Sequence, residues 1–273
     1  MHTPSTRDEC MIIAQLFSVR AEAAEFGWDQ IITMLRDAGF RQVEPYLVAD
    51  MFNEILPIMA RTGVTAPTCH GSLIGDDLPR TLDAAAALDA RLVVQPIFRA
   101  PRWQSPRQVS RIADDLNRAA EAARPYGMRV AFHNHDDEVR TLHAGRRALV
   151  GLMDEVDENV GVQFDPNWAA IGGADPLAVE SELGERVFSL HLKDGPGLGA
   201  NTDQVALGDG TLPWPEILAS APDNTPLVIA PDMFTGDSMD AVIRSYEWLT
   251  ARFGSSATGL EPDRSDPSWT APV

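Results

Sequence analysis

The chain has 273 residues, of which 44% are apolar and 23% charged, with a formal net charge of -18 at pH 7. This composition is typical of a folded globular protein, and the length is sufficient for one large domain with a sizeable core. The negative charge argues against nucleic acid or an anionic membrane as a partner, because both would repel the protein.

The sequence also argues against a membrane-spanning or disulfide-stabilised protein. It contains no run of about 20 apolar residues, and its first ten residues lack the apolar segment of a signal peptide. Two cysteines, Cys10 and Cys69, cannot form a disulfide framework. We therefore expect a cytoplasmic protein, with Cys69 buried as an inert thiol because it lies in an apolar run.

Short apolar runs alternate with amphipathic segments along the chain. The predicted strands are Met11–Ser18, Gln42–Leu47, Thr65–Cys69, Leu92–Ile97, Arg129–Asn134, Val160–Phe164, Val187–Leu192 and Leu227–Ala230. The predicted helices are Trp28–Ala38, Asp50–Thr62, Asp77–Leu88, Pro106–Tyr126, Gly145–Glu155, Asp175–Leu183, Trp214–Ser220 and Ser238–Phe253. Ser105 and Asp175 precede prolines at helix starts, where they are expected to act as N-caps.

Eight strand–helix units without a break in composition predict one domain over residues 1–253. Strands that are apolar almost throughout are typical of a parallel sheet covered on both faces, which favours a (β/α)8 TIM barrel. A doubly wound open sheet is the alternative, but no Gly-rich phosphate loop supports it. Residues 254–273 are rich in Ser, Pro, Asp and Gly, and we expect a flexible tail whose Trp269 could anchor it.

Histidines and carboxylates follow three of the predicted strands. They lie in the segments 132–138 (FHNHDDE), 164–168 (FDPNW) and 190–194 (LHLKD). In a barrel the carboxyl ends of the strands form the active site, so these groups are expected to converge on a divalent metal site. Each residue alone also has an ordinary structural explanation, as a hydrogen-bonded histidine, a helix cap or a solvated carboxylate. The three clusters together favour the metal.

At these residues the sequence resembles the sugar phosphate isomerase/epimerase family, the xylose isomerase-like TIM barrels that include inosose dehydratases and keto-sugar 3-epimerases. The resemblance covers nearly the whole chain and is strongest in the segments 133–138 (HNHDDE), 160–165 (VGVQFD) and 186–194 (RVFSLHLKD). It includes the segments 13–20 (IAQLFSVR) and 39–44 (GFRQVE) as well. Because the family hosts several chemistries, the resemblance predicts the fold more specifically than the substrate.

The resemblance implies a metal held by Glu, Asp, His and a second Glu. Glu138, Asp165 and His191 match the first three, whereas Ala230 stands where the second glutamate is expected. The expected ion is Mn2+, with Mg2+, Co2+ or Zn2+ as alternatives, and no metal at all if Ala230 has abolished the site. Asp232 points to the same side of its strand as Ala230 and could complete the site or act as a base; alternatively, it caps the following loop.

Other residues are expected to contact the substrate or to move its protons. His133, His135, Lys193 and Asp232 are candidate catalytic groups with Glu138, although Lys193 could instead face away and pair with Asp194. The candidate substrate contacts are Glu44, His70, Trp168 and Trp103, although both tryptophans could belong to the core or an interface. Arg102 and two other arginines could receive a phosphate, but an unphosphorylated substrate is favoured because no phosphate-binding glycine loop is present.

These residues predict a metal-dependent isomerase or epimerase that transfers a proton next to the carbonyl of a keto-sugar or cyclitol. Because the second glutamate is missing, a dehydratase (lyase) acting on a keto-sugar or inosose is the alternative. A metal-depleted, non-catalytic sugar-binding barrel or subunit is the alternative from another class. The expected partner is a small sugar-like molecule, and self-association into a homo-oligomer is expected from similar barrels.

Overall fold

The computed structural model describes residues 11–99, 101–196 and 203–253. Eight parallel strands form one sheet in the order β2-β1-β10-β9-β8-β5-β4-β3. Their bounds are β1 Ile12–Gln15, β2 Gln42–Glu44, β3 Thr68–His70, β4 Leu92–Gln95, β5 Arg129–His133, β8 Val160–Phe164, β9 Val187–Leu192 and β10 Leu227–Ile229. Gln42 forms a parallel bridge with Thr65, and the His70 amide donates to the Pro45 carbonyl at 2.8 Å, so the two edge strands also meet. The predicted TIM barrel is confirmed.

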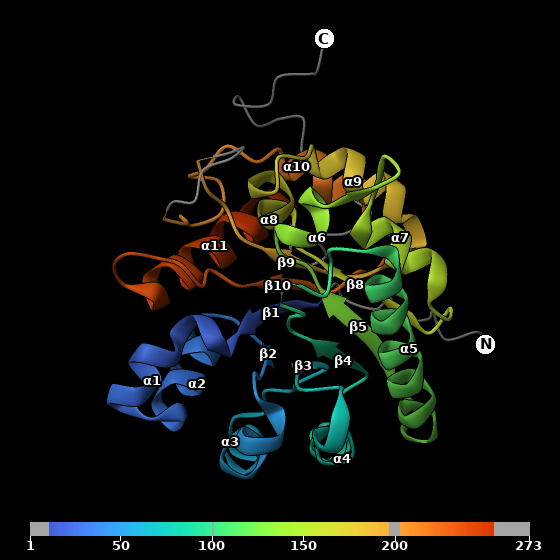
Figure 1. The fold of residues 1–273 in the computed structure, drawn as a ribbon. Coiled ribbons are helices and arrows are strands. Elements are labelled where there is room, and N and C mark those ends of the chain that lie inside the picture. Colours follow the sequence, from blue (N-terminus) through green and yellow to red (C-terminus); the bar gives the residue numbers. More distant parts are fainter. Residues whose placement is uncertain (1–10, 100, 197–202, 254–273) are drawn as a thin grey trace, which may run out of the picture.

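Helices surround the strands on the outside of the barrel (Figure 1). Their bounds are α1 Arg20–Phe26, α2 Trp28–Asp37, α3 Val48–Thr62, α4 Leu78–Ala87, α5 Pro106–Ala123, α6 Asp137–Arg140, α7 Ala148–Glu155, α8 Pro166–Ile171, α9 Pro176–Leu183, α10 Trp214–Ser220 and α11 Ser238–Phe253. Short 3-10 turns occupy Leu16–Val19, Gly75–Asp77, Arg124–Tyr126 and Gly184–Arg186, and β6 Leu142–His143 pairs with β7 Arg146–Arg147 in a small hairpin.

The local signals for helix ends are confirmed at the atomic level. The Ser105 hydroxyl accepts a hydrogen bond from the Gln108 amide, and the Asp175 carboxylate accepts one from Leu177, so both residues are N-caps. Gly63 follows α3 with a φ of 75°, in the left-handed region that glycine enters without a Cβ clash.

The first strand is shorter than predicted because a side chain stops it. The predicted strand ran to Ser18, but β1 ends at Gln15, whose side-chain oxygen accepts from the Phe17 amide and starts a 3-10 turn. Helix α1 was not predicted, and two further helices, α6 and α8, are too short to show a helical period in the sequence. They lie directly after β5 and β8, and therefore place side chains at the carboxyl end of the barrel.

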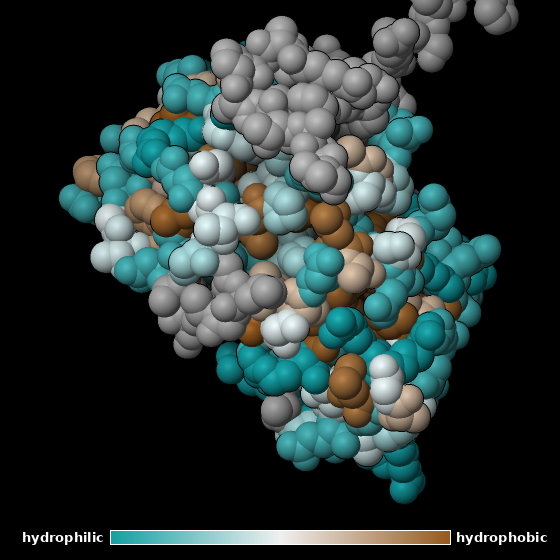
Figure 2. Space-filling view, turned by 90° about the horizontal axis from the view of Figure 1, so that it is seen from above, coloured by the Kyte–Doolittle hydropathy of each residue, from teal (hydrophilic) through white to brown (hydrophobic). Residues whose placement is uncertain are grey.

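The main core lies between the strands and the helices, and smaller apolar clusters fill the barrel interior. One interior cluster contains Ile13, Val228 and Ala230. Cys69 is fully buried, as expected, and burial followed by the nearby Glu44 charge raises the pKa of its thiol. The face seen in Figure 2 is mainly hydrophilic, with hydrophobic residues gathered near its centre.

Two further expectations from the sequence concern membrane-spanning helices and the C-terminal tail. Among the described helices, none has the length and apolar character needed to cross a membrane. The predicted tail, residues 254–273 with Trp269, lies outside the residues that the structure describes.

Candidate functional site

A cavity of about 430 Å³ opens at the carboxyl ends of the strands, where barrel enzymes have their active sites. Its polar wall includes Gln15, His70, Gln95, His133, His135, His191, Lys193 and Asp232. Its apolar wall includes Phe17, Tyr46, Leu47, Pro96, Ile97 and Ala230. The volume lies within the range of roughly 300–1,000 Å³ that small-molecule sites have.

Three buried side chains gather at the base of this region. His133 Nε2 lies 4.0 Å and His191 Nδ1 lies 3.8 Å from Asp165 Oδ2. One donor atom from each residue lies within 4.8 Å of the other two, which makes this set a group that could hold a metal ion. Two imidazoles and one carboxylate form a donor set suited to a borderline divalent ion such as Zn2+ or Fe2+.

Several polar atoms of this group lack a hydrogen-bond partner within the described residues. They include His133 Nδ1 and both ring nitrogens of His191, all shielded from solvent, whereas Asp165 Oδ2 has an ion pair with Lys193 Nζ at 3.0 Å. Buried polar atoms are normally satisfied, and an unsatisfied cluster calls for a ligand or ion that satisfies it. The donor set therefore fits a cation at the His133–Asp165–His191 group.

A second group with metal-ligand spacing contains Glu44, His70 and His191. In this group, however, the Glu44 oxygens already have partners: Oε1 accepts from Gln15 at 2.8 Å and Oε2 accepts from Gln163 at 2.9 Å. His70 Nε2 lies 2.7 Å from the Gln163 side-chain oxygen and 3.1 Å from Glu44 Oε1. Burial would raise the pKa of Glu44, but His70 and His191 outweigh it and lower the pKa. This group is a closed polar network.

Lys193 points into the barrel, so the alternative in which it faces away and pairs with Asp194 is wrong. Residues two apart on a strand share a side, which places Lys193 beside His191. Its Nζ lies 3.0 Å from Asp165 Oδ2 and 2.9 Å from Asp232 Oδ2, and it is 1% exposed. Burial lowers the pKa of this ammonium group, but the two carboxylates outweigh that effect and raise it. Lys193 is a fixed positive charge at the cavity.

Ala230 lines the cavity, as the resemblance to the family implied, and contributes only a methyl group. Its amide donates to the Leu192 carbonyl at 3.0 Å, next to the strand position of Lys193. Asp232 also faces the cavity, but its oxygens are engaged by Lys193 and by the Gln204 amide, which donates at 2.7 Å. Burial raises the pKa of Asp232, and Lys193 and Gln204 more than reverse this effect.

Glu138 lies on α6, directly after β5, and is 2% exposed. Its Oε1 accepts a hydrogen bond of 2.6 Å from the His135 amide, and it belongs to neither of the two groups with metal-ligand spacing. Burial raises the pKa of Glu138 to about 8 despite backbone hydrogen bonds that lower it. Without a cation close by, this carboxyl group is therefore protonated at neutral pH.

His133, at the end of β5, and His135, in the loop after it, are uncharged at neutral pH. Burial, and then the Lys193 charge, lower the pKa of His135 to about 4. Burial and the neighbouring His191 and Lys193 lower the pKa of His133 well below its ordinary value. Both rings line the cavity, and the Nδ1 of each lacks a hydrogen-bond partner in the described part of the chain. Neutral imidazoles in this position can accept a proton.

The four residues predicted to contact the substrate lie in different parts of the structure. His70 lines the cavity, whereas Glu44 lies beneath it and is fully buried. Trp168 packs against His135, with ring centroids 5.2 Å apart, and lies near the Lys193 ammonium. Trp103 is 1% exposed, contacts Phe132 and donates to the Phe98 carbonyl, so it is a core residue.

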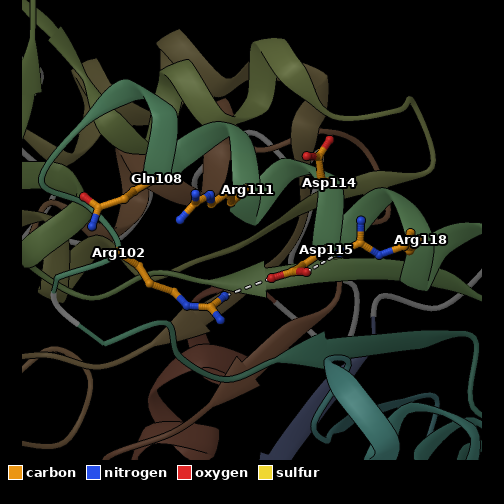
Figure 3. A pocket seen from close by; sticks show the side chains of 6 residues that line it. All are labelled: Arg102, Gln108, Arg111, Asp114, Asp115 and Arg118. Carbon is orange, nitrogen blue, oxygen red and sulfur yellow. Dashed lines mark hydrogen bonds and ion pairs between the residues drawn. The ribbon is translucent and has the colours of Figure 1, made fainter.

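Arg102, which could have received a phosphate, pairs instead with Asp115 of α5 at 2.9 Å. Figure 3 shows this pair within a separate hollow lined by Arg111 and Arg118. Asp115 also contacts Arg118, so one carboxylate serves two guanidinium groups.

Sequence reasoning missed three glutamines of the site. Gln15 and Gln163 bind Glu44, and the Gln95 side chain accepts from the Leu73 amide at the cavity wall. A signal was present, because each is a polar residue at or near the end of an otherwise apolar strand. Such a residue must find a partner inside the barrel.

Comparison with known proteins gives the family context of this site. A family model described as "Xylose isomerase-like TIM barrel" matches residues 21–251. The crystal structure of a sugar phosphate isomerase/epimerase from Parabacteroides distasonis superposes with a TM-score of 0.73 at 20% identity, covering 91% of this chain and 96% of that one. At 20% identity, this structural similarity is evidence for the fold alone.

Two curated relatives match over a shorter part of the chain. The rhizopine catabolism protein MocC of Rhizobium meliloti is 30% identical over 103 residues, which is 38% of this chain and 30% of that protein. An inosose dehydratase of Lacticaseibacillus casei is 27% identical over 100 residues, 37% of this chain and 31% of that enzyme. The matched segments thus span less than a third of these relatives.

Proposed function

The chain belongs to the xylose isomerase-like TIM barrel family, and on that premise we propose that it removes a proton next to the carbonyl of a keto-sugar or cyclitol with the help of a divalent metal. The observation that carries the proposal is the unpartnered, buried Nδ1 of His191, which lies 3.8 Å from Asp165 Oδ2 beside a cavity lined by His133 and His135. Sugar-modifying enzymes are the family context of this chain.

Asp165, His191 and His133 would hold the cation, and Glu138 is the additional ligand that the resemblance implies. A divalent cation bound there supplies a Lewis acid that polarises a carbonyl oxygen and stabilises the negative charge that develops on it. Glu138 lies on α6, five residues after His133, and would have to leave the His135 amide to reach the group. Mn2+ and Zn2+ are the ions to test first.

The protein side chains then divide the proton transfers between them. His135 carries no proton on one ring nitrogen at neutral pH and faces the cavity, so it would accept the proton from the substrate carbon while His133 holds the cation. The Lys193 ammonium, held by Asp165 and Asp232, would donate a hydrogen bond to a substrate oxygen.

Dehydration is the outcome that the site favours over epimerisation. Epimerisation in this family uses a second metal-bound glutamate on the opposite face of the substrate carbon, and Ala230 has no carboxylate. In a dehydration the C–H bond is broken by an imidazole, the carbon–carbon double bond forms, and a β-hydroxyl leaves as water after it takes up a proton. Inosose dehydratases among the relatives support this choice.

The test uses metal-free protein that is reloaded with Mn2+ or Zn2+ and incubated in D2O with keto-sugars and inososes. We expect metal-dependent deuterium incorporation next to the carbonyl together with an absorbing enone product. Deuterium exchange with isomer formation but no loss of water would support the isomerase alternative. Exchange that survives chelation, or its absence from the whole panel with metal-loaded protein, would refute the proposal.

The variants Asp165→Ala and His191→Ala provide the residue-level check. Each should lose metal and reduce product formation by at least about a hundredfold, which corresponds to about 2.7 kcal/mol. Asp209→Ala, which removes an exposed partner of Arg244, is the control and should leave both quantities unchanged.

A further inference from the structure

The Glu44 carboxylate lies beneath the cavity and is held from two sides by side-chain amides. It is 0% exposed, and the Nε2 atoms of Gln15 and Gln163 donate to its two oxygens at 2.8 and 2.9 Å. These residues come from β1, β2 and β8, which lie far apart in the sequence. Only the closed barrel brings them together.

Both amides are fixed in orientation by a second contact. The Gln15 oxygen accepts from the Phe17 amide at 3.0 Å, so its nitrogen has to face Glu44. The Gln163 oxygen lies 2.7 Å from His70 Nε2, so the nitrogen of Gln163 also has to face Glu44. Position 44 must therefore accept hydrogen bonds on both oxygens, which a carboxylate does and a neutral amide does not.

The two nitrogens of the His191 ring face two different carboxylates. Nε2 lies 3.4 Å from Glu44 Oε1, and Nδ1 lies 3.8 Å from Asp165 Oδ2. The ring stacks on His70 with centroids 5.5 Å apart and meets His133 edge-on at 4.4 Å, so neighbouring rings limit its rotation. Glu44, as an ionised acceptor, is a favourable partner for a proton on Nε2.

We infer that Glu44 is a positioning residue that keeps the proton of His191 on Nε2 and thereby presents the Nδ1 lone pair toward Asp165, where the proposed cation binds. A histidine that binds a metal through one nitrogen commonly donates its other N–H to a carboxylate, which fixes the tautomer and the ring orientation. The inference rests on the proposed metal site for its consequence, but the tautomer itself is a property of the metal-free protein.

The position of the His191 proton can be measured directly by long-range 15N–1H spectra of protein labelled at histidine, before and after addition of Zn2+. The His191 signals are assigned by their loss in His191→Asn. We expect the proton on Nε2 in both states, with only the Nδ1 resonance changed by Zn2+. A proton on Nδ1 in the metal-free protein would overturn the inference.

The variant Glu44→Gln tests the consequence for metal binding. Its amide nitrogen would meet a Gln15 or Gln163 donor, so His191 should lose its single tautomer and the Zn2+ affinity should fall by about 10- to 100-fold. The matched control is Glu180→Gln, which changes another buried glutamate, on α9, that accepts from the Ser220 hydroxyl. An unchanged Zn2+ affinity in a folded Glu44→Gln protein would also overturn the inference.

The two proposals can fail separately. If Zn2+ does not bind to the wild-type protein, the proposed metal chemistry fails. The spectrum of the metal-free protein still shows which nitrogen of His191 carries the proton. If Zn2+ binds and activates the protein but His191 is protonated on Nδ1, the proposed function stands and the role of Glu44 is refuted.

Discussion

At the scale of the residue, the absence of a carboxylate at position 230 determines the chemistry of the site. Ala230 lies at the cavity wall where the family resemblance predicts a glutamate, and Lys193 brings a positive charge to the neighbouring strand. The cavity wall thus has a methyl group at position 230 beside a cationic side chain. Lys193 and a metal ion would therefore compete for the Asp165 carboxylate, and this competition is central to the site.

The substitution Ala230→Glu should shift this balance toward the metal. A carboxylate at this position adds a fourth donor, and we expect the affinity for Mn2+ to increase by about tenfold or more, which corresponds to about 1.4 kcal/mol. Ala230→Gln has a similar size without the charge and serves as the control. Isothermal titration of both variants decides, and equal affinities would mean that the residue 230 side chain does not reach the cation.

Removing Lys193 should destabilise the metal-free protein. Lys193→Met leaves Asp165 without its counter-charge, and breaking a buried ion pair from one side costs roughly 3–5 kcal/mol. The same change at Arg244, whose pair with Asp209 is half-exposed, should cost less than about 1 kcal/mol. Urea unfolding in the presence of a chelator measures both, and similar losses would contradict the account.

At the scale of the element, two strands, β8 and β9, and two helices, α10 and α11, have the bounds that the sequence predicts. The bounds of β8 and β9 agree with their predicted bounds because each is a mainly apolar run flanked by polar residues. The short helices α6 and α8 could not be predicted, since six residues or fewer show no helical period. Their positions matter, because α6 carries Glu138.

The residues of the candidate site could be proposed from the sequence for a similar reason. Strand ends identify Asp165 and His191, and the period of two could have placed Lys193 correctly. The network of Gln15, Glu44 and Gln163 could not be predicted in the same way. Its members are up to 119 residues apart in sequence for the Gln163–Glu44 pair, and which of them touch depends on the register of the closed barrel.

The contact between α9 and α10 predicts how the stability of the protein depends on pH. Burial raises the pKa of Glu180 to about 7 although the Ser220 hydroxyl donates to it. The folded protein therefore binds a proton that the unfolded chain releases near pH 4.5, so this group reduces stability as the pH rises from about 4.5 to 7.

Glu180→Gln removes this titration and retains a hydrogen-bond acceptor for Ser220. Relative to the variant, the wild-type protein should lose roughly 1–3 kcal/mol of unfolding free energy between pH 5 and pH 8. Urea unfolding at several pH values provides the measurement. A constant difference across this range would show that Glu180 is ionised at its ordinary pKa in the folded protein.

At the scale of the whole molecule, closure of the barrel gathers imidazoles from distant parts of the chain in one buried place. His70, His133, His135 and His191 come from three different strands and the loop after β5, and closure brings their rings within 6 Å of at least one other. Burial lowers the pKa of His133 and His135, so these rings remain neutral donors for a metal and acceptors for a proton. The same closure shields them from water.

The most direct test of the account is a crystal of the Zn2+-soaked protein, measured at the zinc absorption edge. The account predicts one anomalous peak at the carboxyl end of the barrel, within about 2.0–2.2 Å of His191 Nδ1 and an oxygen of Asp165. The absence of a peak at this position, with Lys193 Nζ still bound between Asp165 and Asp232, would contradict it.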